Sequence, residues 1–142
     1  MTQPYAIAVQ GKYLGKYLAS TDIIDWLHPD VSQLAMQLAE GKQAGMLAQP
    51  TEWSIAKACF EWVRDEVRHS VDYQLNPATC RASDVLTHRT GYCFAKSHLL
   101  AALLRANGIP AGLCYQRLSI ADIGPHYSLH GFNAVYLPSL GW

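Results

Sequence analysis

The sequence predicts a single α+β domain in which N-terminal helices pack on an antiparallel sheet near the C-terminus. Apolar residues recur at helical spacing between residues 30 and 107, and two alternating, strand-like segments follow at 111–118 and 130–137. Helices that precede strands in this way are typical of an α+β fold. The 142 residues contain no linker, and half of them are hydrophobic, so one domain with one core is expected.

The first predicted helix has Asp30 as its N-cap and ends at Gly41. The second is capped by Thr51, and Cys59 falls on its apolar stripe, which predicts a cysteine in the core. Residues 1–20 carry the short tandem GKYLGKYL, which is too brief for a repeat architecture and reads as an extended or edge segment.

The middle of the chain alternates irregular and helical stretches. Residues 69–82 are polar and irregular, and residues 84–86 predict a single helical turn. A strongly helical pattern then runs over residues 93–107, where an Asn-Gly pair followed by proline ends it. Residues 119–129 are predicted to connect the two strands.

Charge and hydropathy exclude several classes of partner. Eleven basic residues balance eleven acidic ones, so neither nucleic acid nor an anionic membrane is expected to bind. No segment approaches the roughly 20 apolar residues that span a bilayer. Lysines interrupt the N-terminal segment, which predicts no signal peptide and a cytoplasmic protein with reduced thiols. The four cysteines are therefore expected to be core residues, a nucleophile or metal ligands rather than disulfides.

Cys93 and His130 are the candidate catalytic pair. Cys93 follows Gly-Tyr at the predicted start of a helix, where unpaired N–H groups favour a thiolate. His130 is predicted to open a strand and to share a core-directed face with Phe132 and Ala134, from which it reaches the helix. A buried structural cysteine and a hydrogen-bonded core histidine are the alternatives.

The block GYCFAKSHLLAALLRANGIPAGLCYQRL followed by HGFNAVYLPSLGW resembles the transglutaminase-like superfamily, in its bacterial cysteine-protease-like branch. The likeness covers about residues 50–142 and extends more loosely to the N-terminal third. The resemblance implies a papain-like core in which a helix bearing the nucleophile Cys93 packs on a sheet bearing the general base His130. It also implies an acid on the next strand and acyl transfer on amides.

The chain departs from that pattern in two places. His130-Gly131-Phe132 stands where the family commonly has His-Ala-Trp, and no acidic residue follows His130. We expect one domain that lacks its C-terminal strands, with residues 1–50 as an N-terminal part and residues 51–142 as the core. Asn133 is predicted to lie on the opposite strand face and is a poor substitute for the acid.

Several other polar residues are candidate binding groups. Tyr92, His126 and Tyr127 are candidates to line a substrate cleft, although solvated or packing roles explain them too. His69 lies in a predicted loop, where a solvated role is the default. Four residues could suggest a metal site, but their spacing matches no common zinc pattern, and neither metal nor cofactor is expected. These are Cys80, His88, Cys93 and His98.

Three functions remain open from the sequence. The first is a cysteine peptidase or amidase acting on a peptide or protein amide, with hydrolysis preferred to cross-linking because no DxDxDG calcium loop is present. The second is a non-catalytic domain that keeps the fold and binds a peptide or protein. The third is a metal-binding or redox module. An open sheet edge would also favour a homo-oligomer.

Overall fold

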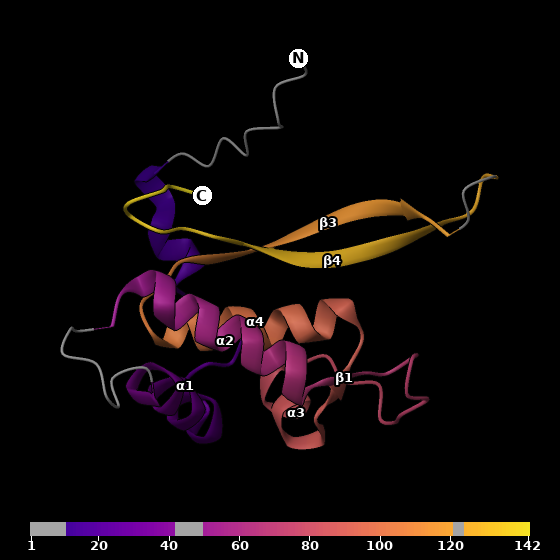
Figure 1. The fold of residues 1–142 in the computed structure, drawn as a ribbon, viewed down its shortest axis with the longest axis horizontal. Helices are drawn as coiled ribbons and strands as arrows, with labels where there is room; N and C mark the ends of the chain where they lie inside the picture. The colour runs from indigo at the N-terminus through magenta and orange to yellow at the C-terminus, as the bar shows by residue number, and fades with distance from the viewer. Residues whose placement is uncertain (1–10, 42–49, 121–123) are drawn as a thin grey trace, which may run out of the picture.

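The computed structural model describes residues 11–41, 50–120 and 124–142, and it confirms the α+β class. Helices come first and a long hairpin follows (Figure 1). The elements are η1 (Gly11–Tyr17), α1 (Pro29–Gly41), α2 (Glu52–Glu66), β1 (Arg68–His69), α3 (Ala82–His88), β2 (Thr90–Gly91), α4 (Cys93–Ala106), β3 (Ala111–Ser119) and β4 (Tyr127–Val135).

Helix α4 is the centre of the fold. The three other α-helices contact it, and both strands of the hairpin pack along it, so it is covered by the helical layer and by the hairpin (Figure 1). Leu99, Leu103 and Leu104 on this helix are almost fully buried, as is Ile109 just beyond its end. Burial of each such side chain contributes about 1.5–3 kcal/mol, so α4 is held firmly where its first residue can carry chemistry.

The predicted helix boundaries are nearly right, with one change of cap. Thr51 caps α2 as predicted, because its hydroxyl accepts a hydrogen bond from the Ser54 N–H at 3.2 Å. Helix α1, however, begins at Pro29, which is tolerated in a first turn because its missing N–H would be unpaired there. His28 takes the capping role expected of Asp30, and its Nδ1 lies 3.3 Å from the Asp30 N–H.

Two helical segments differ from the prediction. The part of residues 1–20 that the structure describes forms the 3-10 helix η1 rather than an extended segment, and residues 1–10 lie outside the described chain. Helix α3 spans seven residues instead of one turn. Its N-terminal N–H groups bond to distant residues: Ala82 donates to the Ile23 carbonyl at 2.8 Å, and Ser83 donates to Asp25. These contacts supply partners that the local sequence does not.

A short parallel ladder, which the sequence did not predict, joins β1 to β2. Arg68 pairs with Thr90, and His69 pairs with Gly91. The buried hydroxyls of Ser70 and Thr90 lie 2.9 Å apart beside it. This ladder brings the segment after α2 against the residues that lead into α4.

The hairpin is antiparallel, as predicted, but the second strand starts earlier. Strand β4 begins at Tyr127, and the pairing continues to Ser119 opposite Tyr127, so His130 lies within the strand instead of opening it. The prediction of a connection over residues 119–129 is therefore wrong at both ends. Residues 127–129, Tyr-Ser-Leu, extend the ladder beyond the predicted start, because they pair with the outer residues of β3.

The strand face was also predicted wrongly. Gly131, Asn133 and Val135 approach α4 and the core, whereas His130 and Phe132 stack on each other on the alternate face. Gly131 explains the choice, because a Cβ there would lie 3.0 Å from the Phe94 Cα. The absence of a side chain lets the strand backbone come close to the first turn of the helix.

Candidate active site

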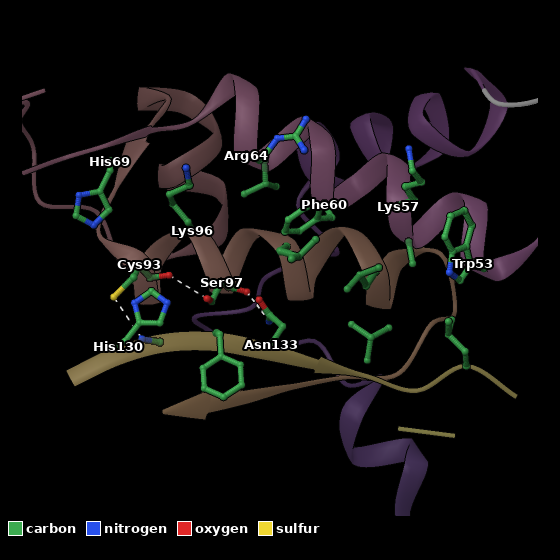
Figure 2. Close-up of a pocket in the computed structure, with 18 residues that line it drawn as sticks. Trp53, Lys57, Phe60, Arg64, His69, Cys93, Lys96, Ser97, His130 and Asn133 are labelled. Carbon is green, nitrogen blue, oxygen red and sulfur yellow. Dashed lines mark hydrogen bonds between the residues drawn. The ribbon is translucent and has the colours of Figure 1, made fainter. Parts of the chain in front are cut away.

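A pocket of about 670 Å³ lies between α2, α4 and β4 (Figure 2). Cys93, His69 and His130 are at one end of it, and Trp53 is at the other. Much of its wall is apolar, contributed by residues such as Phe60. A concave, largely apolar site with a few convergent polar groups is the usual form of a small-molecule or peptide site.

Cys93 is the first residue of α4, as the sequence predicted. Tyr92 before it is extended, with φ −68° and ψ 170°, so the chain turns into the helix at the cysteine. The Gly131 N–H donates a hydrogen bond to the Cys93 Sγ at 3.3 Å, and the Leu129 carbonyl lies 4.0 Å from the sulfur. The sulfur therefore lies at the positive end of the α4 dipole, beside a main-chain donor.

His130 lies on β4 and lines the same pocket as Cys93. Figure 2 draws the two side chains at the same end of the pocket. The imidazole is half-buried and stacks on the Phe132 ring, with centroids 6.4 Å apart and an interplanar angle of 14°. Within the described residues, no hydrogen bond joins this ring to the Cys93 sulfur, and no carboxylate lies within 4.0 Å of it.

The residues considered for the substrate cleft lie elsewhere in the structure. Tyr92 is half-buried, with its ring stacked parallel to Phe94 and edge-on to His69. His126 and Tyr127 are exposed at the outer end of the hairpin, where Arg117 covers the Tyr127 ring at 4.4 Å. None of these three belongs to the described lining of the pocket, although Tyr92 adjoins it through His69.

Asn133 joins β4 to α4 by a hydrogen bond. Its Nδ2 donates to the Ser97 carbonyl at 3.0 Å and lies 3.4 Å from the Gly112 carbonyl. Ser97 in turn donates from its hydroxyl to the Cys93 carbonyl at 2.9 Å. The amide therefore braces the first turns of α4, and its donor is directed to main-chain carbonyls.

The chain matches the model of the transglutaminase-like superfamily over residues 37–142, which is 106 of the 142 residues. The chain belongs to this superfamily. A solved protein from Cytophaga hutchinsonii that is proposed to be a cysteine protease has the same fold, with a TM-score of 0.65 and 20% sequence identity. That alignment covers 95% of this chain and 42% of the other. A comparison with curated proteins found no match.

Membership of the transglutaminase-like superfamily supports a cysteine-dependent type of enzyme at the superfamily level. This chain spans 42% of the length of the similar solved protein. No helix among the described residues is long and apolar enough to cross a membrane. The described residues also contain no group of three or more histidine, cysteine or acidic side chains placed to hold a metal ion.

The other cysteines of this transglutaminase-like chain occupy ordinary positions. Cys59 is fully buried, as predicted, and burial raises the pKa of its thiol to about 12. Cys80 is exposed and Cys114 is half-buried on β3, and all four thiols are free. Because these thiols differ in exposure, they are internal references for the reactivity of Cys93.

The pocket also includes polar residues beyond the candidate pair. Lys96 and Ser97 follow Cys93 on α4 and line the pocket, and burial lowers the pKa of the Lys96 ammonium. His69 was expected to be solvated in a loop, yet it forms part of the pocket wall. No sequence signal indicates this, because a two-residue strand such as β1 has no detectable periodicity.

Proposed function

We propose that this chain carries the nucleophile and general base of a cysteine-dependent peptidase or amidase. One observation carries the proposal. Cys93 is the first residue of α4, its sulfur accepts a hydrogen bond from the Gly131 N–H, and it lines the same pocket as His130. A thiol on a helix N-terminus beside an imidazole is the arrangement that generates a reactive thiolate.

The reaction that fits these groups is acyl transfer from an amide. His130 accepts the thiol proton while the sulfur of Cys93 forms a bond to the carbonyl carbon, and the carbonyl electron pair moves to oxygen. In this proposal the main-chain N–H of Cys93 stabilises that oxygen. The C–N bond then breaks, the amine leaves with the proton from His130, and water hydrolyses the thioester.

Alkylation by iodoacetamide, followed residue by residue by peptide mass, tests the pair. We expect Cys93 to react faster than Cys80, although Cys80 is the more exposed thiol. His130→Ala should remove most of this advantage and leave the rate at Cys80 unchanged. Cys59 should stay unmodified in the folded protein, because it is buried and its pKa is about 12.

A second function is favoured by the surroundings of His130. Among the described residues, no carboxylate orients its ring, and loss of the orienting acid lowers the rate of proteases with other folds by orders of magnitude. A non-catalytic domain that binds a peptide in the pocket is consistent with this. Equal alkylation of Cys93 and Cys80, unaffected by His130→Ala, would favour the binding domain over the enzyme.

A further inference from the structure

His69 lines the pocket because it lies on β1, which pairs with β2 just before α4. Its partner in the β1–β2 pairing is Gly91, two residues before Cys93, and the Ser70 N–H donates to the Gly91 carbonyl at 3.1 Å. His69 therefore enters from the β1 side, whereas His130 enters from β4 (Figure 2). Two imidazoles from different elements thus share the end of the pocket that holds the nucleophile.

The two nitrogens of the His69 ring have different surroundings. Nδ1 is closed to solvent and has no hydrogen-bond partner, and the Asp72 Oδ2 lies 3.6 Å from it. The side chain as a whole is still 31% exposed. Nε2 is consequently the nitrogen available to a bound molecule. In the tautomer that carries its proton on Nε2, this N–H can donate a hydrogen bond to an anion.

The cationic side chains that line the pocket already have partners. Lys57 pairs with Glu61 at 2.6 Å, Arg64 pairs with Asp65 at 2.7 Å, and the Lys96 ammonium donates to the Val67 carbonyl at 2.5 Å. None of these contacts involves His69 or His130. If His130 serves as the base, the His69 imidazole is a second ring donor for negative charge at the Cys93 end of the described lining.

We propose that His69 is a further catalytic residue, which donates a hydrogen bond from Nε2 to the oxyanion of the tetrahedral intermediate. The proposal rests on the proposed function. As the sulfur of Cys93 bonds to the carbonyl carbon, the displaced electron pair resides on the oxygen beside Nε2–H. The donor keeps its proton throughout, and the pair returns to the carbonyl when the C–N bond breaks.

Two reactions of the same thiol separate this role from a structural one. Acetylation by p-nitrophenyl acetate passes through an oxyanion, whereas alkylation by iodoacetamide does not. We expect His69→Leu to slow acetylation of Cys93 by about 100-fold, as expected for loss of one oxyanion donor, and to leave its alkylation rate unchanged. His69→Gln keeps an N–H donor and should retain most of the acetylation rate.

His28 provides a matched control, because its Nδ1 also lies near an acid, 4.0 Å from Asp30, but outside the described lining of the pocket. His28→Gln should change neither rate. Equal acetylation of wild type and His69→Leu would overturn the role of His69 while leaving the proposed function intact. Parallel losses in both reactions would reduce His69 to a structural residue. Absence of acetyl-Cys93 in wild type would overturn both proposals.

Discussion

At the scale of single residues, Gly131 decides how the strand meets the nucleophile. A Cβ at this position would lie 3.0 Å from the Phe94 Cα and 3.2 Å from its N, so only glycine fits without movement. The same residue supplies the N–H that donates to the Cys93 sulfur. The close approach and the hydrogen bond therefore depend on one another, because the bond is short only while the backbones are close.

Gly131→Ala tests this dependence. We expect a loss of about 1–3 kcal/mol in the free energy of unfolding, because the added methyl group pushes β4 away from the rigid first turn of α4. Urea denaturation measures it, and alkylation of Cys93 reports the altered site. Gly41→Ala is the control, since nothing lies within 4 Å of a Cβ there. Equal stability of the two variants would contradict the packing argument.

At the scale of elements, the β3–β4 hairpin consists of two unlike halves. The inner half is buried or half-buried against α4, from Ala111 to Cys114 and from Gly131 to Val135. The outer half, from Tyr115 to Ser119 and from Tyr127 to Leu129, is exposed. His130 lies opposite Gln116, where the two halves meet. One member of the candidate pair thus sits at the border of the anchored part.

Hydrogen exchange should distinguish these halves. We expect main-chain amides of the outer half to exchange at least about tenfold faster than those of the inner half, because few buried contacts oppose their local opening. Exchange measured by NMR on the native protein would test this, with the buried middle of α4 as the slow reference. Uniform protection along the hairpin would show that the outer half is stabilised by something other than burial.

Features set by neighbouring residues could be predicted from the sequence, and those set by distant contacts could not. The Thr51 cap and the start of α4 at Cys93 depend on local signals, and both are confirmed. The length of α3 depends on the Ile23 carbonyl, which accepts a hydrogen bond from the Ala82 N–H. The orientation of β4 depends on the close contact of Gly131 with Phe94. The position of His69 beside the pocket likewise depends on pairing with a segment some 20 residues away.

At the scale of the whole molecule, Arg105 joins an N-terminal segment to the point where α4 leads into the hairpin. The residue is 8% exposed, and its guanidinium donates twice to the Ala111 carbonyl, at 3.1 and 2.8 Å, and once to the Ala19 carbonyl at 2.8 Å. Main-chain carbonyls therefore stabilise the positive charge of Arg105, while burial lowers the pKa of its guanidinium. This residue connects the segment after η1, the end of α4 and the start of β3.

Arg105→Met should destabilise the protein by about 3 kcal/mol, because it leaves two carbonyls without their donors in a buried region. Thermal and urea unfolding provide the measurement. Arg81→Met, at an exposed arginine, is the control and should change stability little. A similar, small effect for both substitutions would mean that the hydrogen bonds of the buried guanidinium add nothing to stability beyond the packing of the side chain.

The hydrogen bond from the Gly131 N–H to the Cys93 sulfur has a consequence for genetic studies of the site. Its donor belongs to the main chain, so every genetically encoded residue except proline would carry this N–H, although any side chain at position 131 would also move β4 away from Phe94. A scan of alanine substitutions along β4 would alter the space around the sulfur without deleting this donor. Replacement of the amide by an ester, through chemical synthesis of the strand, would delete the donor and leave every side chain in place.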